Sequence, residues 1–101
     1  MKIRDKVSGG ELTVYGIYWF EGGTTTFCCF PIDTHGLSGY GQEEVDIIDP
    51  VIEGEFVFRV TANRMNGFFH KHVLADNLLD ALFDHNEAAY QKLTALLGKA
   101  P

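Results

Sequence analysis

The first third of the chain alternates β-type runs with turn-forming residues. Residues 12–20 are rich in β-branched and aromatic side chains and are apolar on both alternating sets, which is typical of a central strand covered on each face. A glycine pair at residues 22–23 turns the chain, and residues 24–30 form a second β-type run. That run stops at Pro31, which has no amide hydrogen to donate to a neighbouring strand. The two runs therefore predict a β-hairpin.

A glycine-rich segment and several shorter strands are expected next. Residues 33–41 contain three glycines among polar residues, and we interpret them as a surface loop with Leu37 and Tyr40 as its anchors. Short strands are predicted at four further places, namely residues 3–7, 44–48, 55–61 and 68–72. Within residues 55–61 the apolar side chains occupy alternate positions, so they share one face of that strand.

Beyond Val73 the spacing of apolar residues becomes helical. Three aspartates fall four residues apart on one stripe, and the apolar positions of the predicted amphipathic helix are Leu74, Leu78, Leu79, Leu82 and Phe83. Asn86 can cap a second helix, and Gly98 is placed to end it. We therefore expect one α+β domain over residues 1–101, with an antiparallel sheet of five or six strands, open or partly closed into a barrel, followed by two C-terminal helices.

Charge is concentrated in one place, which we call the acidic segment. Residues 43–55 carry six acids and no base, in a chain of formal charge −6. Because a nucleic-acid surface needs clustered Lys and Arg, this pattern argues against nucleic acid and favours a protein partner with a basic surface. We expect a non-enzymatic binding protein whose acids steer that partner. The candidate partner-binding residues are Tyr40, Glu43, Glu44, Asp46, Asp49 and Glu53.

The adjacent cysteines and the apolar runs bear on the cellular setting. No apolar run reaches the roughly 18 residues that a membrane span needs, and no signal peptide is recognised, so we expect neither a membrane association nor secretion. Cys28 and Cys29 would point to opposite faces of a strand, which disfavours a disulfide between them. A cytoplasmic protein with two reduced, buried thiols is expected.

Histidines offer an alternative interpretation as a small enzyme or a metal- or ligand-binding domain. On an extended strand His70 and His72 would share a face, and His35, Cys28 or Asp33 could supply further ligands. The spacing matches no zinc motif, and nothing flanking the cysteines would activate a thiolate. We therefore expect no cofactor and no metal site, with His70, His72 and His35 as the metal-ligating candidates of the alternative interpretation.

An aromatic cluster provides a third interpretation. Tyr15, Tyr18, Trp19 and Phe20 should lie mostly in the core, but one alternating set could be incompletely covered in so small a domain. An uncovered aromatic patch or an exposed strand edge would suit a homodimeric adaptor module.

Four stretches of the sequence carry a resemblance, and they are residues 36–40, 44–50, 56–58 and 68–73. Read together, with a Leu-rich helix after them, they resemble small bacterial α+β proteins found in mobile gene cassettes and beside toxin genes as immunity proteins. The resemblance transfers no functional residue. It implies that the chain binds and neutralises a partner protein.

Overall fold

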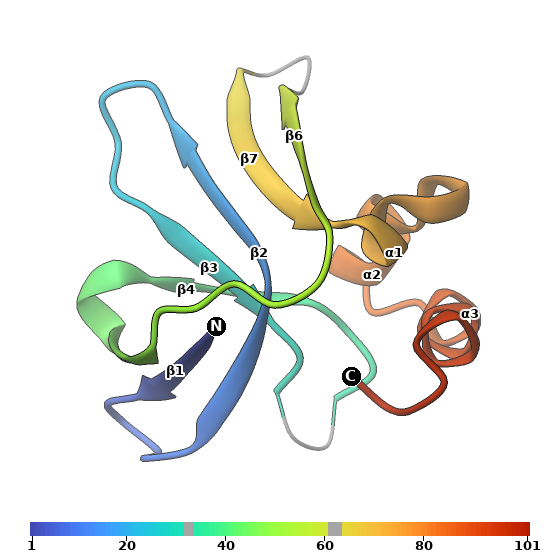
Figure 1. Cartoon of the computed structure of the whole chain (residues 1–101), viewed down its shortest axis with the longest axis horizontal. Coiled ribbons are helices and arrows are strands. Elements are labelled where there is room, and N and C mark those ends of the chain that lie inside the picture. The colour runs from blue at the N-terminus through green and yellow to red at the C-terminus, as the bar shows by residue number, and fades with distance from the viewer. Residues whose placement is uncertain (32–33, 61–63) are drawn as a thin grey trace.

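The structure of the protein, a computed structural model, describes residues 1–31, 34–60 and 64–101 (Figure 1). Its strands are β1 (Lys2–Asp5), β2 (Glu11–Phe20), β3 (Thr26–Cys29), β4 (Ser38–Gly41), β5 (Val45–Asp49), β6 (Phe56–Val60) and β7 (Met65–His70). Its helices are α1 (Lys71–Leu74), α2 (Leu78–Phe83) and α3 (Glu87–Leu97), with single 3-10 turns η1 (Gln42–Glu44) and η2 (Ala75–Asn77). Figure 1 shows the three α-helices gathered on one side of the strands.

Strand β2 is the centre of the sheet, and every pairing is antiparallel. Its first residues pair with β1, and its second half lies between β3 and β7. The strand order β4-β3-β2-β1-β5 therefore carries a branch in which β7 pairs with β2 and β6 pairs with β7. The strands so placed form an open sheet rather than a closed barrel, and the expected α+β class is confirmed.

The described residues form seven strands where five or six were expected, because the weakly patterned N-terminal strand does form and one segment expected to be a loop pairs with a strand. The N-terminal strand forms as β1, between β2 and β5. β4 lies inside the stretch that we interpreted as a surface loop, and all four of its residues pair with β3. Glycines predict a turn from local preference alone, whereas here pairing of the whole segment with β3 makes it a strand.

Two hydrophobic cores lie on opposite sides of the β2–β3 pair. The larger core joins the sheet to the helices and contains Cys28, Phe69 and Leu82. The smaller core lies under β1 and β5 and contains Ile3 and Cys29. The adjacent cysteines thus point into different cores, as successive residues of a strand must, and both thiols are free and buried.

The helical region confirms one prediction and corrects another. α3 begins at its predicted cap, where Oδ1 of Asn86 accepts a hydrogen bond from the amide of Ala89 at 3.0 Å, and it ends at Gly98 with a φ of 76°. The single helix expected after Val73 is instead broken into α1, η2 and α2. Asp76 and Asn77 have φ values of 51° and 57°, in the left-handed region, so the helical path is interrupted there.

Candidate protein-binding surface

The acidic segment follows the chain from η1 through β5 to the start of β6. Glu43 and Glu44 are exposed on η1, and Asp46 is exposed on β5. Glu53 is exposed on the connection that follows β5. Of the remaining candidates, Asp49 is half-buried on β5, and the side chain of Tyr40 packs partly against the smaller core. The candidates therefore spread along a path and do not form one compact patch.

Bases on β1 and on the residue that follows it lie beside the acidic segment, and the sequence of residues 43–55 does not reveal them. The antiparallel β1–β5 pairing sets Arg4 opposite Asp46 and Lys2 opposite Asp49. Nζ of Lys6 donates a hydrogen bond to the carbonyl oxygen of Glu43 at 3.2 Å. Opposite charges on facing strand positions offset one another, so this part of the surface is less acidic than residues 43–55 suggest.

The charged residues have a second effect, because β5 is an edge strand. Unpaired backbone groups at a sheet edge attract other strands, and charged side chains discourage that pairing. Asp46 and Asp49 place such charges on β5, and β4, at the other end of the strand order, is a four-residue strand with two glycines. These two edges are protected against strand addition.

The third edge, formed by β6, is more apolar and carries one charged residue, Arg59. Its sequence is FVFRV, and among the described strands only β7 pairs with it. The amide of Lys71 donates to the carbonyl of Glu55 at 2.9 Å, and the register pairs Val57 with Phe69. Since hydrogen-bonded positions alternate along an antiparallel pair, Phe56, Phe58 and Val60 turn their amide and carbonyl groups outward. Figure 1 shows β7 between β2 and β6, so β6 is the outermost strand of this branch of the sheet.

An aromatic cluster covers one side of this hairpin, and we call it the apolar face: Trp19, Phe58, Val60 and Phe68. The ring of Phe68 lies 5.1 Å from that of Phe58 and 6.1 Å from that of Trp19, between ring centroids. Phe58 is 51% exposed, Val60 56% and Phe68 41%. Phe68 pairs with Ile17 and Phe58, whereas the neighbouring Phe69 enters the larger core, so the apolar face lies on the side of the sheet away from the helices.

Sequence reasoning did not include the apolar face or the β6 edge among the site residues. The alternation of Phe56, Phe58 and Val60 shows that one face of the strand is apolar, but it does not show that this face lacks a covering layer. Of the aromatic cluster singled out from the sequence, Tyr15 is buried, Tyr18 and Trp19 are partly covered and Phe20 is exposed.

The histidine candidates separate into two groups. The rings of His70 and His72 lie 5.2 Å apart. His35 instead stacks on Tyr90 at 4.8 Å, and its Nδ1 lies 3.8 Å from Oε1 of Glu87. Asp33 lies outside the described residues. Within the described parts of the chain, no three His, Cys, Asp or Glu side chains are grouped as a metal site.

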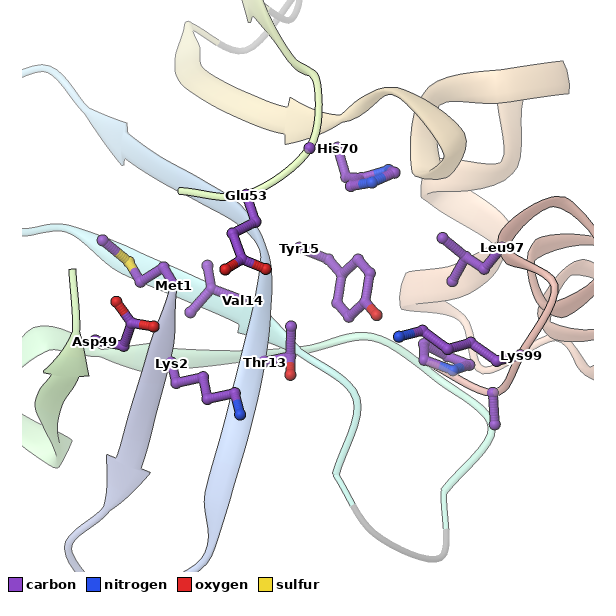
Figure 2. Close-up of a pocket in the computed structure, with 13 residues that line it drawn as sticks. Met1, Lys2, Thr13, Val14, Tyr15, Asp49, Glu53, His70, Leu97 and Lys99 are labelled. Carbon is purple, nitrogen blue, oxygen red and sulfur yellow. The ribbon is translucent and has the colours of Figure 1, made fainter. Parts of the chain in front are cut away.

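A cleft of about 590 Å³ opens beside His70, and Figure 2 shows its lining. Lys2, Lys99, Asp49 and Glu53 are all among the residues that line it, so the cleft contains both positive and negative charges. Nδ1 of His70 accepts a hydrogen bond from the amide of His72 at 3.1 Å and thereby caps α1. Burial lowers the pKa of His70, and electrostatic interactions with His72 and Lys71 lower it further.

The cysteines are not placed for nucleophilic chemistry. Burial raises the pKa of the Cys28 thiol, and it raises that of Cys29 to about 12, so both stay protonated at neutral pH. Neither cysteine lines the cleft beside His70.

Comparison of the chain with protein-family models, with curated proteins and with solved structures gave no match in any of the three. Among the helices of the described residues, none has the length and apolar character that a membrane crossing needs.

Proposed function

We propose that this protein is a non-enzymatic binding domain that takes up an extended segment of another protein along the β6 edge. The observation that carries the proposal is the contrast between edges: β5 bears Asp46 and Asp49, whereas β6 turns the backbone of three apolar residues outward. In strand addition, main-chain hydrogen bonds supply affinity, and side chains at alternate positions supply specificity.

The apolar face gives such a partner a desolvated contact. A strand added to β6 would carry its alternate side chains beside Phe58 and Val60, on the same face as Trp19 and Phe68. Aromatic residues that already pack against one another contribute apolar area with little loss of rotamer freedom. The proposal therefore assigns affinity to β6 and to the apolar face.

In this proposal the acidic segment sets the rate of encounter. Glu53 and Glu55 immediately precede β6, and long-range attraction of a basic partner raises association rates more than it raises affinity. Glu43 and Glu44 are exposed at the far end of the segment and add to the same field. The role is that of an immunity or inhibitor protein acting in the cytoplasm.

The first test uses peptides, because strand addition requires only an extended segment. A display library of random, unstructured peptides is panned against the protein, with the variant Phe58→Pro as counter-selection. Proline at residue 58 removes an outward amide hydrogen but none that faces β7. We expect enriched peptides with apolar residues at alternate positions, and about tenfold weaker binding to the Phe58→Pro variant.

A matched pair of valines distinguishes binding at the β6 edge from nonspecific hydrophobic binding. Val60 lies on β6 and is 56% exposed, and Val51 lies on the preceding connection and is 61% exposed. Lysine at residue 60 should weaken binding of the selected peptides, whereas lysine at residue 51 should leave it unchanged. Equal binding by the wild type and both β6 variants would contradict the proposal.

A further inference from the structure

We propose that the β6 edge pairs with the β6 edge of a second copy of this chain. This inference rests on the proposed function, because it uses the same edge, which a second copy occupies when the basic partner is absent. Charges at the two ends of β6 favour this pairing. Glu55 precedes β6, and Arg59 lies within it. An antiparallel alignment of two identical strands places the acidic end of each beside the basic end of the other.

One register satisfies both the charges and the backbone. With Val57 on the two-fold axis, Glu55 of each copy stands opposite Arg59 of the other, and Phe56 stands opposite Phe58. Because Phe56 and Phe58 turn their amide and carbonyl groups outward, this register lets both residues hydrogen-bond across the axis. Moving the axis to Phe58 would set Val57 opposite Arg59, and moving it to Arg59 would oppose two positive charges, which is unfavourable.

The pairing would also enlarge the apolar face. A two-fold axis perpendicular to the sheet keeps the helices of both copies on one side and the two apolar faces on the other. The rings of Phe58 and Phe68 from each copy would then lie on one continuous sheet. A dimer of this kind removes the exposed β6 edge, which otherwise invites uncontrolled association.

Sedimentation velocity across a wide range of protein concentrations tests the inference. We expect the apparent mass of the wild type to rise from 11.3 kDa toward twice that value. Phe58→Pro should stay monomeric at every concentration, Val60→Lys, at the end of the paired segment opposite Gly54, should dimerise more weakly than the wild type, and Val51→Lys should dimerise as the wild type does. Circular dichroism and thermal melting establish that each variant is folded, and the exposure of Val60 and Val51 makes folding of both lysine variants the expectation.

A charge swap tests the register. Glu55→Arg and Arg59→Glu should each raise the dissociation constant of the dimer by about tenfold, and the double variant should restore it. Oε2 of Glu55 also lies 3.1 Å from Nζ of Lys71 within the same chain. Arg59→Glu cannot replace that contact, so recovery in the double variant reports on the contact between copies.

The outcomes separate this inference from the proposed function. A wild type that stays monomeric throughout, or that dimerises regardless of the β6 variants, overturns the inference. Peptides that still select the β6 edge in that case leave the proposed function standing. A dimer that responds to Val60→Lys but is not restored by the charge swap overturns the register argument and with it the inference.

Discussion

The ring of Phe69 occupies the space where a side chain of Gly16 would lie. A β-carbon built on Gly16 falls 2.6 Å from Cδ1 of Phe69, and one built on Gly67 falls 2.7 Å from Cε2 of the same ring. The two glycines lie on β2 and β7, and Gly16 pairs directly with Phe69. Phe69 is fully buried, so this contact attaches the branch that carries β6 to the larger core.

Gly16→Ala should destabilise the protein, because the new methyl group overlaps a ring that a packed core holds in place. We expect a loss of about 1–3 kcal/mol in the free energy of unfolding, measured by urea denaturation. Adding Phe69→Leu should recover part of that loss, since a smaller side chain leaves room for the methyl group. A Gly16→Ala variant as stable as the wild type would show that the ring can move aside.

The same contact shows which parts of the fold the local sequence pattern can predict and which it cannot. β-branched and aromatic composition predicts β2 and β3, and the helical spacing of apolar residues predicts the change to helices; each of these is confirmed. Neither pattern explains why a glycine stands at residue 16 within β2, because the reason is the ring of Phe69, more than fifty residues away. The strand β4 was missed for a similar reason: its glycines favour a turn locally, and only pairing with β3 makes it a strand.

The break between α1 and α2 gives a prediction that opposes helix propensity. Alanine is the best helix former, yet Asp76 and Asn77 have left-handed φ values that a β-carbon disfavours and that Asn and Asp tolerate better. Asp76→Ala and Asn77→Ala should therefore each cost about 1 kcal/mol in unfolding free energy. Gln91→Ala, exposed within α3, is the control and should change stability by at most a few tenths of a kcal/mol. Increased stability in the first two variants would indicate that the helix can run through.

The candidate site was only partly accessible to sequence reasoning. The acids of residues 43–55 are evident in the sequence, but the bases that face them belong to β1, and only the β1–β5 register brings Arg4 opposite Asp46. Likewise, exposure of Phe58 depends on which strands and helices fail to cover it. Which edges are paired is a property of the whole sheet, and a local window does not contain it.

The two thiols should be unreactive in the folded protein. Burial raises the pKa of both, and the thiolate is the reactive form, so a disulfide reagent such as dithionitrobenzoate should modify neither Cys28 nor Cys29 under native conditions at neutral pH. Both should react in strong denaturant. Rapid modification of one thiol without unfolding would contradict its placement in a core.

Stability should fall as the solution becomes acidic, in part through His70. Its ring packs against Tyr15 and Phe56, and Nδ1 must stay unprotonated to accept the hydrogen bond from the amide of His72. Burial, then His72 and Lys71, lower its pKa, while Glu55 acts weakly in the opposite direction. Above the ordinary value of 6.5 both the folded and the unfolded chain hold this group neutral, so its contribution is fully present.

As the pH falls through 6.5, the unfolded chain takes up a proton that the folded chain resists, and unfolding becomes more favourable. Asn is the control substitution, because its side chain can still cap α1 but does not titrate. His70→Asn should lower stability at neutral pH, because the ring contacts with Tyr15 and Phe56 are lost, but it should show a shallower loss between about pH 7 and pH 5 than the wild type. Urea denaturation across that range measures the difference, and parallel stability curves for the two proteins would assign the acid sensitivity to other groups.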